Sequence, residues 1–164
     1  MAELTNLESK LGEVTGLAMA AKTATSRVTT LARREHEELV DDLQRMAEEA
    51  AETERRCTEL SGSFDGKKTA ILEEARSTKD KAASMLDIYL DDESDTLDGF
   101  EFLTMAEAGE VGHWEVLREL ARKAGHDDVL ELVDWALPIQ QGHFDTARAT
   151  STKLAATKPP DEEE

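Results

Sequence analysis

Apolar residues recur three or four positions apart along most of this chain, and no stretch alternates apolar and polar residues as a half-buried strand does. The spacing is most regular in two C-terminal segments that are separated by the turn Gly125-His126-Asp127-Asp128. The first segment carries Leu103, Ala106, Glu110, His113, Leu117, Leu120 and Ala124, and the second carries Val129, Val133, Ala136, Gln140, His143, Ala147, Thr150 and Leu154. Each set forms one stripe on an α-helix, and the short turn between them predicts an antiparallel pair. The chain is therefore predicted to be all-α.

The rest of the chain divides into helices at its turn residues. A first helix is predicted to open at a capping box formed by Thr5 and Glu8 and to continue to about Leu60. It is either unbroken or split near residues 24–30, where a threonine-rich run has low helix propensity. Further helices are predicted over about 67–90, 96–124 and 128–155. The expected fold is an antiparallel four-helix bundle, with a fifth helix if the first is split. It forms one domain, residues 1–157, followed by a disordered acidic tail, residues 158–164.

Composition narrows the function classes. Aromatic residues make up 4% and charged residues 34% of the 164 residues, which is typical of a helical protein built on Leu and Ala. A formal net charge of −18 repels nucleic acid and anionic membranes, so neither is an expected partner. Cys57 has no second cysteine to pair with, and the acidic N-terminus lacks the pattern of a signal peptide. We therefore expect a cytoplasmic protein.

Two short segments within the predicted helix pair repeat one pattern. Glu110 and His113 lie three residues apart, as do Gln140 and His143, so each pair shares one helix face. The two pairs are also nearly equally far from the turn at His126. Glu110 is therefore predicted to face His143, and His113 to face Gln140. The four side chains would form one polar layer across an apolar seam.

A glycine precedes the histidine of each segment, at Gly112 and Gly142. Glycine inside a helix costs about 1 kcal/mol relative to alanine, so its presence needs a reason. Close approach of a neighbouring helix is the simplest reason, and we expect it at both glycines.

The polar layer has two interpretations. Carboxylates and imidazoles together suit iron, manganese or zinc, which makes the layer a candidate non-haem metal site. The candidate ligands are Glu110, His113 and His143, with Glu107 one turn away, and Glu35 and Glu38 from the first helical region. In the alternative, the same side chains satisfy one another's hydrogen bonds and hold the helices in register. In either case a carboxylate partner is expected to raise the pKa of His143.

The segment from about Gly99 to Ala155 carries a recognisable set of residues. They are Glu107, Glu110, His113, the run Leu117-Arg118-Glu119-Leu120-Ala121, Gly125, and the pair Gln140 and His143. With this set the segment resembles the C-terminal hairpin of the ferritin-like superfamily, which includes stress-induced bacterial relatives of rubrerythrin and ferritin.

The resemblance implies a set of metal ligands. Glu110 or Glu107 would be the bridging glutamate of the third bundle helix, and His143 the histidine of the fourth. Glu35 and Glu38 would be the carboxylates of the first half. Gln140 stands where the family has a glutamate, and the first half has no Glu-x-x-His, so the implied set is incomplete. The helix over 67–90 would be the crossover between the bundle halves if the N-terminal region is split.

These observations lead to two hypotheses about function. The first is a ferritin-like bundle with a degenerate non-haem metal site, acting in stress response or metal handling. The alternative is a non-catalytic interaction or structural protein that oligomerises, or binds a protein partner, through its long N-terminal helix. A homodimer is expected in either case. A di-iron oxidase or peroxidase is disfavoured because ligands are missing. The sequence also has no phosphate-binding loop and no nucleophile motif, so we favour a non-enzymatic role.

Overall fold

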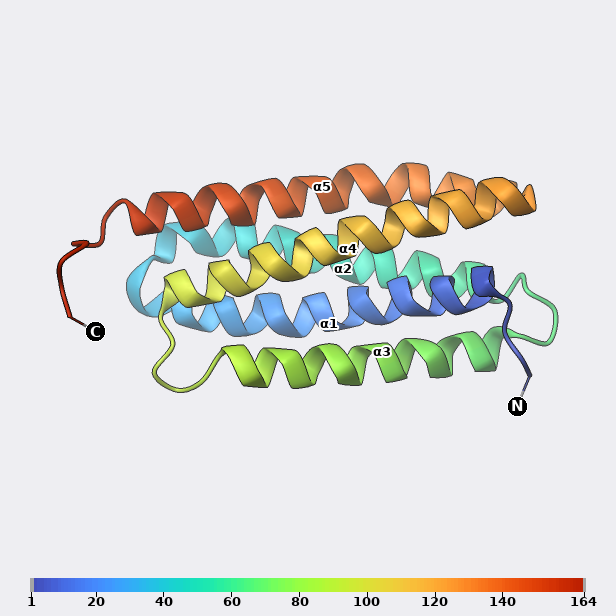
Figure 1. The fold of residues 1–164 in the computed structure, drawn as a ribbon, viewed down its shortest axis with the longest axis horizontal. Helices are drawn as coiled ribbons and strands as arrows, with labels where there is room; N and C mark the ends of the chain where they lie inside the picture. Colours follow the sequence, from blue (N-terminus) through green and yellow to red (C-terminus); the bar gives the residue numbers. More distant parts are fainter. Residues whose placement is uncertain (1, 164) are drawn as a thin grey trace.

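The computed structural model describes residues 2–163, and they form five α-helices without a strand (Figure 1). The helices are α1 (Asn6–Glu35), α2 (Val40–Ser61), α3 (Lys68–Tyr89), α4 (Thr96–Ala124) and α5 (Asp127–Ala155), with a short 3₁₀ turn, η1 (Glu37–Leu39), between the first two. The all-α prediction is confirmed. Met1 and Glu164, the outer ends of the predicted domain and tail, lie outside the described residues.

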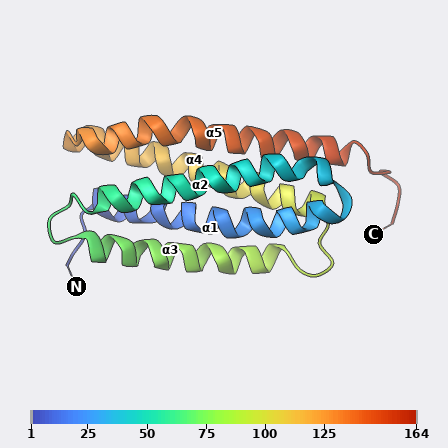
Figure 2. The ribbon, with the colours of Figure 1, turned by 180° about the vertical axis from the view of Figure 1, so that it is seen from behind.

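Successive helices run in opposite directions, and α1 lies at the centre of the arrangement. It packs against α2, α3 and α4, while α5 packs against α4 and α2. Figures 1 and 2 show α3 at the edge of the molecule, where it runs beside α1 and returns the chain from the end of α2 to the start of α4. No helix within residues 2–163 combines the length and the apolar character that crossing a bilayer requires.

The helix ends follow the chemistry of their capping residues. Glu8 N donates to Thr5 Oγ1 at 3.3 Å and Thr5 N donates to Glu8 Oε2 at 2.7 Å, so the predicted capping box is present. At the C-terminal end of α4, Gly125 has a left-handed conformation with φ of 63°, which glycine adopts without strain. His126 then caps α5 by accepting a hydrogen bond from Val129 N at 3.4 Å.

The N-terminal region is split, but not near residues 24–30. Those residues lie inside α1, and the chain turns instead at His36. The threonines that lower helix propensity are accommodated because their hydroxyls bond within the helix: Thr29 Oγ1 donates to the carbonyl oxygen of Thr25 at 2.7 Å. Both threonines are buried against the neighbouring helices, and this packing outweighs their propensity.

The apolar core consists of two clusters, one in each half of the bundle's length. One contains Ala24, Val28, Ala32, Val40, Leu43, Leu86, Leu90, Phe100, Phe102, Leu103, Ala147 and Leu154. The other contains Leu11, Val14, Cys57, Ile71, Trp114, Leu117, Ala121, Val129, Leu132, Val133 and Ala136. Burial raises the pKa of the Cys57 thiol to about 12, so this cysteine is a protonated core residue. Along both α4 and α5, the buried residues between the two clusters are polar.

Close helix approach occurs at Gly12 and Gly16, and the expectation for Gly112 and Gly142 is wrong. A Cβ atom at Gly12 would lie 2.8 Å from the backbone oxygen of Ile71, and one at Gly16 would overlap the backbone of Ala75. A Cβ atom at Gly112 or Gly142 would meet no atom within 4 Å. The two N-terminal glycines therefore hold α1 tightly against the first half of α3.

The bounds of α3, α4 and α5 agree with the expected helix bounds to within one residue. Beyond α5, residues 156–163 are exposed, and Lys158 forms an ion pair with Asp95 at the start of α4. The disorder that we expect for the acidic tail remains a prediction.

Candidate ligand pocket and polar layer

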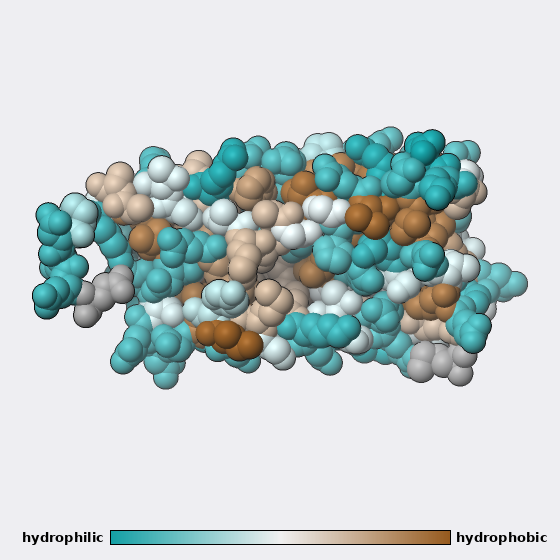
Figure 3. Space-filling model, viewed as in Figure 1, coloured by the Kyte–Doolittle hydropathy of each residue, from teal (hydrophilic) through white to brown (hydrophobic). Residues whose placement is uncertain are grey.

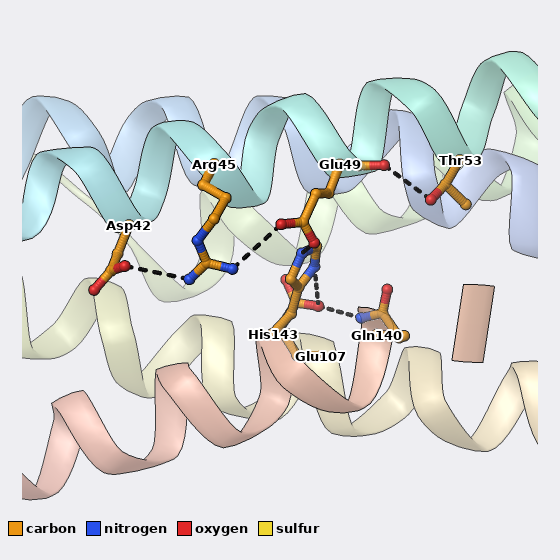
Figure 4. A network of polar contacts seen from close by, with 7 residues as sticks. All are labelled: Asp42, Arg45, Glu49, Thr53, Glu107, Gln140 and His143. Atoms are coloured by element: carbon orange, nitrogen blue, oxygen red, sulfur yellow. Dashed lines mark hydrogen bonds and ion pairs between the residues drawn. The ribbon is translucent and has the colours of Figure 1, made fainter. Parts of the chain in front are cut away.

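Three helices contribute to a buried polar layer between the two apolar clusters. Glu107 on α4 is 1% exposed and His143 on α5 is 2% exposed. Gln140 Nε2 donates a hydrogen bond to Glu107 Oε2, and His143 Nδ1 lies 3.7 Å from the same oxygen. His143 Nε2 lies 3.0 Å from Glu49 Oε2 of α2. Figure 4 shows the imidazole held between the two carboxylates, so the layer joins α2, α4 and α5.

The polar contacts continue outward along α2. Arg45 Nη1 donates to Glu49 Oε1 at 3.2 Å, and Arg45 Nη2 donates to Asp42 Oδ1 at 3.2 Å (Figure 4). Both Arg45 and Asp42 are exposed. A continuous line of charged groups thus runs from the centre of the bundle at Glu107 to solvent.

The protonation of His143 reflects two opposing effects. Burial of the imidazole favours its neutral form and by itself would lower the pKa. The hydrogen bonds and negative charges of Glu107 and Glu49 favour the imidazolium and together outweigh the burial, so the pKa of His143 is raised from 6.5. This is the direction expected from the sequence.

The predicted partners within the layer are wrong by one helical turn. Glu107, rather than Glu110, contacts His143, and Gln140 contacts Glu107, rather than His113. The cause is the rotation of α4. At 100° per residue, His113 lies about 80° around the helix from Leu103, and the adjacent Trp114 occupies the inward position with an exposed fraction of 1%.

His113 lies outside the layer. Its side chain is 40% exposed, and Nδ1 is 3.2 Å from Glu13 Oε2 and 3.2 Å from Lys10 Nζ, both on α1. The predicted inward position of His113 is therefore wrong.

The two upstream candidates, Glu35 and Glu38, lie near the turn between α1 and α2. Glu35 Oε2 accepts hydrogen bonds from the backbone N of Thr96 at 3.2 Å and from its hydroxyl at 2.8 Å. Glu38 is exposed, and its Oε1 lies 3.2 Å from Nδ1 of His36. Of the six predicted ligands, the structure brings Glu107 and His143 into contact, and Glu110 lies near Glu107 without contacting His143.

The layer includes one carboxylate that the sequence analysis missed. Glu49 lies three residues after Met46 and four before Thr53, and both of these are buried on α2. Its position at the edge of that stripe was the available signal. Within residues 2–163, no group of three or more His, Cys, Asp or Glu side chains is arranged to hold a metal ion.

A pocket of about 420 Å³ lies on the other side of α4. It is bounded by α1, by the second half of α3 and by α4, and Figure 3 shows it as a hollow near the centre of that face. Small and apolar side chains form most of the wall: Leu17, Ala20, Ala21, Ala24, Ala82, Ala83, Leu86, Phe102, Leu103, Ala106 and Gly109. Alanines on three adjacent helices leave space that larger side chains would fill.

Glu110 lines this pocket and is 5% exposed. Among the described residues, none donates a hydrogen bond to its carboxylate or forms an ion pair with it. Its pKa is raised well above the usual 4.5, first because it is buried and second because of the negative charge of Glu107. Glu107 also lines the pocket, as do Lys79 and His113.

Two of the large apolar side chains that remain exposed, Met85 and Met105, line the pocket. Within residues 2–163 the exposed side chains of this kind are Met85, Ile88 and Tyr89 on α3 and Met105 and Val116 on α4. α1 carries none of them. α1 packs against three other helices, and oligomerisation or partner binding through the N-terminal region stays a prediction.

Comparison with known proteins finds no matching family model, no matching curated protein and no matching solved structure.

Proposed function

We propose that this protein is a non-catalytic binding protein that holds a small, mainly apolar molecule in the pocket between α1, α3 and α4. The observation that carries the proposal is the combination of apolar walls with a buried, unpartnered carboxylate at Glu110. Binding pockets for small molecules are concave and mostly apolar, with few polar groups that orient the ligand.

The size of the pocket supports this function. A volume of about 420 Å³ lies within the range of roughly 300–1,000 Å³ that small-molecule sites occupy. An engineered apolar cavity of about 150 Å³ already holds benzene. The pocket therefore has room for a ligand with two fused or linked rings, or for a comparable alkyl chain.

The way α3 is attached supports it as well. α3 is held tightly against α1 where it passes Gly12 and Gly16, and the pocket lies beside the second half of α3, from Lys79 to Leu86. Beyond the pocket, the end of α3 packs on the start of α4, where the ring centroids of Tyr89 and Phe102 lie 6.0 Å apart. The pocket is thus bounded by packed side chains at both ends, and a ligand can fill it without disturbing the rest of the core.

A pair of matched glycine variants tests the proposal. Gly109 lines the pocket and Gly112 does not, although both lie on α4 and a Cβ atom at either would meet no atom within 4 Å. Leucine at either position should stabilise the helix by about 1 kcal/mol. Only Gly109→Leu places a side chain at the pocket.

The probe for this test is N-phenyl-1-naphthylamine, which is uncharged at neutral pH and fluoresces in apolar sites. The wild type and Gly112→Leu should bind one equivalent with equal affinity, and Gly109→Leu should bind at least tenfold more weakly. Absence of saturable binding to the wild type, or equal binding by the two variants, would contradict the proposal.

A second candidate function is the ferritin-like bundle with a degenerate metal site in stress response or metal handling. Two observations favour it: α3 returns the chain between the two helical hairpins, and Glu107, Glu110 and His143 occupy the same central part of the bundle as Glu49. Metal binding would require these side chains to rearrange around the ion. Stoichiometric binding of Fe(II), Mn(II) or Zn(II) that raises the melting temperature, and that is lost in His143→Ala but not in His113→Ala, is the expected result. A melting temperature that none of the three metals changes would exclude this candidate.

A further inference from the structure

The pocket contains an unusual imbalance of charge. Glu107 and Glu110 lie three residues apart on α4 and both line the pocket, which has mainly apolar walls. Glu107 is satisfied from the side of α5 by Gln140 and His143, but no described residue pairs with Glu110. A buried carboxylate without a partner is costly, and it is neutralised either by a proton or by a cation.

The basic side chains that line the pocket do not pair with Glu110. His113 is held on the outside by Glu13 at 3.2 Å, and Lys79 is exposed on α3. Neither forms an ion pair with Glu110. The position beside the Glu110 carboxylate is thus open to a cation that enters with the ligand.

The walls of the pocket indicate which kind of cation fits. A hydrated metal ion gains nothing from surfaces of alanine, leucine and phenylalanine, whereas an organic cation buries its carbon skeleton there. A formal net charge of −18 also attracts cations toward the protein and repels anions.

We propose that the ligand of this pocket is an organic amine, whose ammonium group pairs with Glu110 while its apolar body lies between α1, α3 and α4. This inference rests on the proposed function and names the chemical class of its ligand. The ammonium group has three hydrogen-bond donors, enough to reach the oxygens of Glu110 and a nearby acceptor.

When an amine binds, its ammonium group replaces the proton held by the Glu110 carboxyl group. Because the pKa of Glu110 is raised, its carboxyl group holds a proton in the empty pocket more readily than an exposed carboxyl group does. When the ammonium group takes its place beside the carboxylate, that proton passes to the buffer. No covalent bond of the ligand forms or breaks.

Three naphthalene probes of similar size test the inference by isothermal titration calorimetry at neutral pH. Naphthalen-1-ylmethylamine is the cation, naphthalen-1-ylmethanol its uncharged analogue, and 1-naphthoate the anion. The proteins are the wild type, Glu110→Gln, and Glu115→Gln, which removes the same charge from an exposed site on the same helix.

The wild type and Glu115→Gln should bind the amine at least tenfold more tightly than the alcohol. Glu110→Gln should bind the two within about twofold of each other and keep its affinity for the alcohol, which also reports that the variant is folded. Tightest binding of 1-naphthoate, equal binding of amine and alcohol by the wild type, or an amine preference retained in Glu110→Gln would each overturn the inference and leave the proposed function standing. Failure of all three probes to bind would contradict the proposed function itself.

Discussion

Glu107 and Glu110 are neighbours on α4, yet one belongs to a satisfied polar layer and the other to an unsatisfied pocket. The carboxylate of Glu107 faces α5, where Gln140 and His143 contact it. Glu110 lies about 60° further around the helix, on the side where α1 and α3 border an apolar pocket, and the described residues offer it no partner. The same residue type is structural on one side of the helix and available for binding on the other.

The difference between the two sides comes from the helices that face them. α5 is packed along α4 and contributes polar side chains at the correct height, as does α2 with Glu49. α3 packs chiefly against α1, and next to the pocket it contributes two alanines and apolar side chains but no partner for Glu110. A buried carboxyl group without a hydrogen-bond partner needs an explanation in a folded protein, and a ligand in the pocket is the one that we propose for Glu110.

The largest effect is expected from removing the centre of the layer. His143→Ala leaves Glu107 and Glu49 facing each other without the imidazole between them, and one of the two carboxylates is fully buried. The free energy of unfolding should fall by about 3 kcal/mol, as measured by urea denaturation. His113→Ala, which removes a half-exposed imidazole from the same bundle, should change it by about 0.5 kcal/mol or less. Equal losses in the two variants would contradict the structural role of the layer.

A smaller change in the free energy of unfolding, of opposite sign, is expected from replacing Glu110 in the pocket. Glu110→Met replaces an unpaired buried carboxyl group with an apolar side chain of similar length. The free energy of unfolding at neutral pH should rise by about 1–2 kcal/mol, while amine binding is lost. A lower stability than that of the wild type would mean that Glu110 is paired in the folded protein.

The pH dependence of the stability that Glu110→Met gains gives a sharper test. The pKa of Glu110 is raised in the folded protein above its ordinary value of 4.5. Folding therefore favours the protonated carboxyl group, and the wild type loses stability as pH rises from 4.5 through the folded pKa. The advantage of Glu110→Met should be smallest below pH 4.5 and should grow as pH rises. An advantage that shrinks with rising pH would contradict the assigned direction.

The contrast between the two sides of α4 was only partly predictable from the sequence. Spacing and capping residues were sufficient to place α4 and α5 and to bury Glu110 and His143, because each depends on a few neighbouring residues. Whether Glu107 or Glu110 faces His143 depends on the rotation of α4, which the burial of Trp114 decides. A three-residue spacing alone does not report that rotation.

The pocket could be predicted from the sequence even less well than the polar layer. Its walls come from α1, α3 and α4, and Ala20, Ala82 and Ala106 each read as ordinary small residues of an amphipathic helix. The space exists because small side chains of α1, α3 and α4 face one another where the three helices meet. That arrangement depends on three helices together, and the periodicity of one helix does not report it.

The smallest effect is expected from a substitution at Glu49, which lies on the solvent side of His143 in the polar layer. Glu49→Gln keeps a hydrogen-bonding group beside His143 Nε2 but removes one of the two negative charges that raise the pKa of the imidazole. The pKa of His143, followed by NMR titration of its ring protons, should therefore fall relative to the wild type. Glu48→Gln, an exposed neighbour on α2, should leave it unchanged.

The same substitution affects stability in a defined pH window. The raised pKa of His143 contributes stability that is fully present below the unfolded value of 6.5 and is lost as pH rises through the folded pKa. Glu49→Gln should therefore be less stable than Glu48→Gln at pH 5.5, and the gap should narrow above neutral pH. A gap that does not change with pH would mean that Glu49 stabilises the layer by packing, leaving Glu107 as the main charge partner of His143.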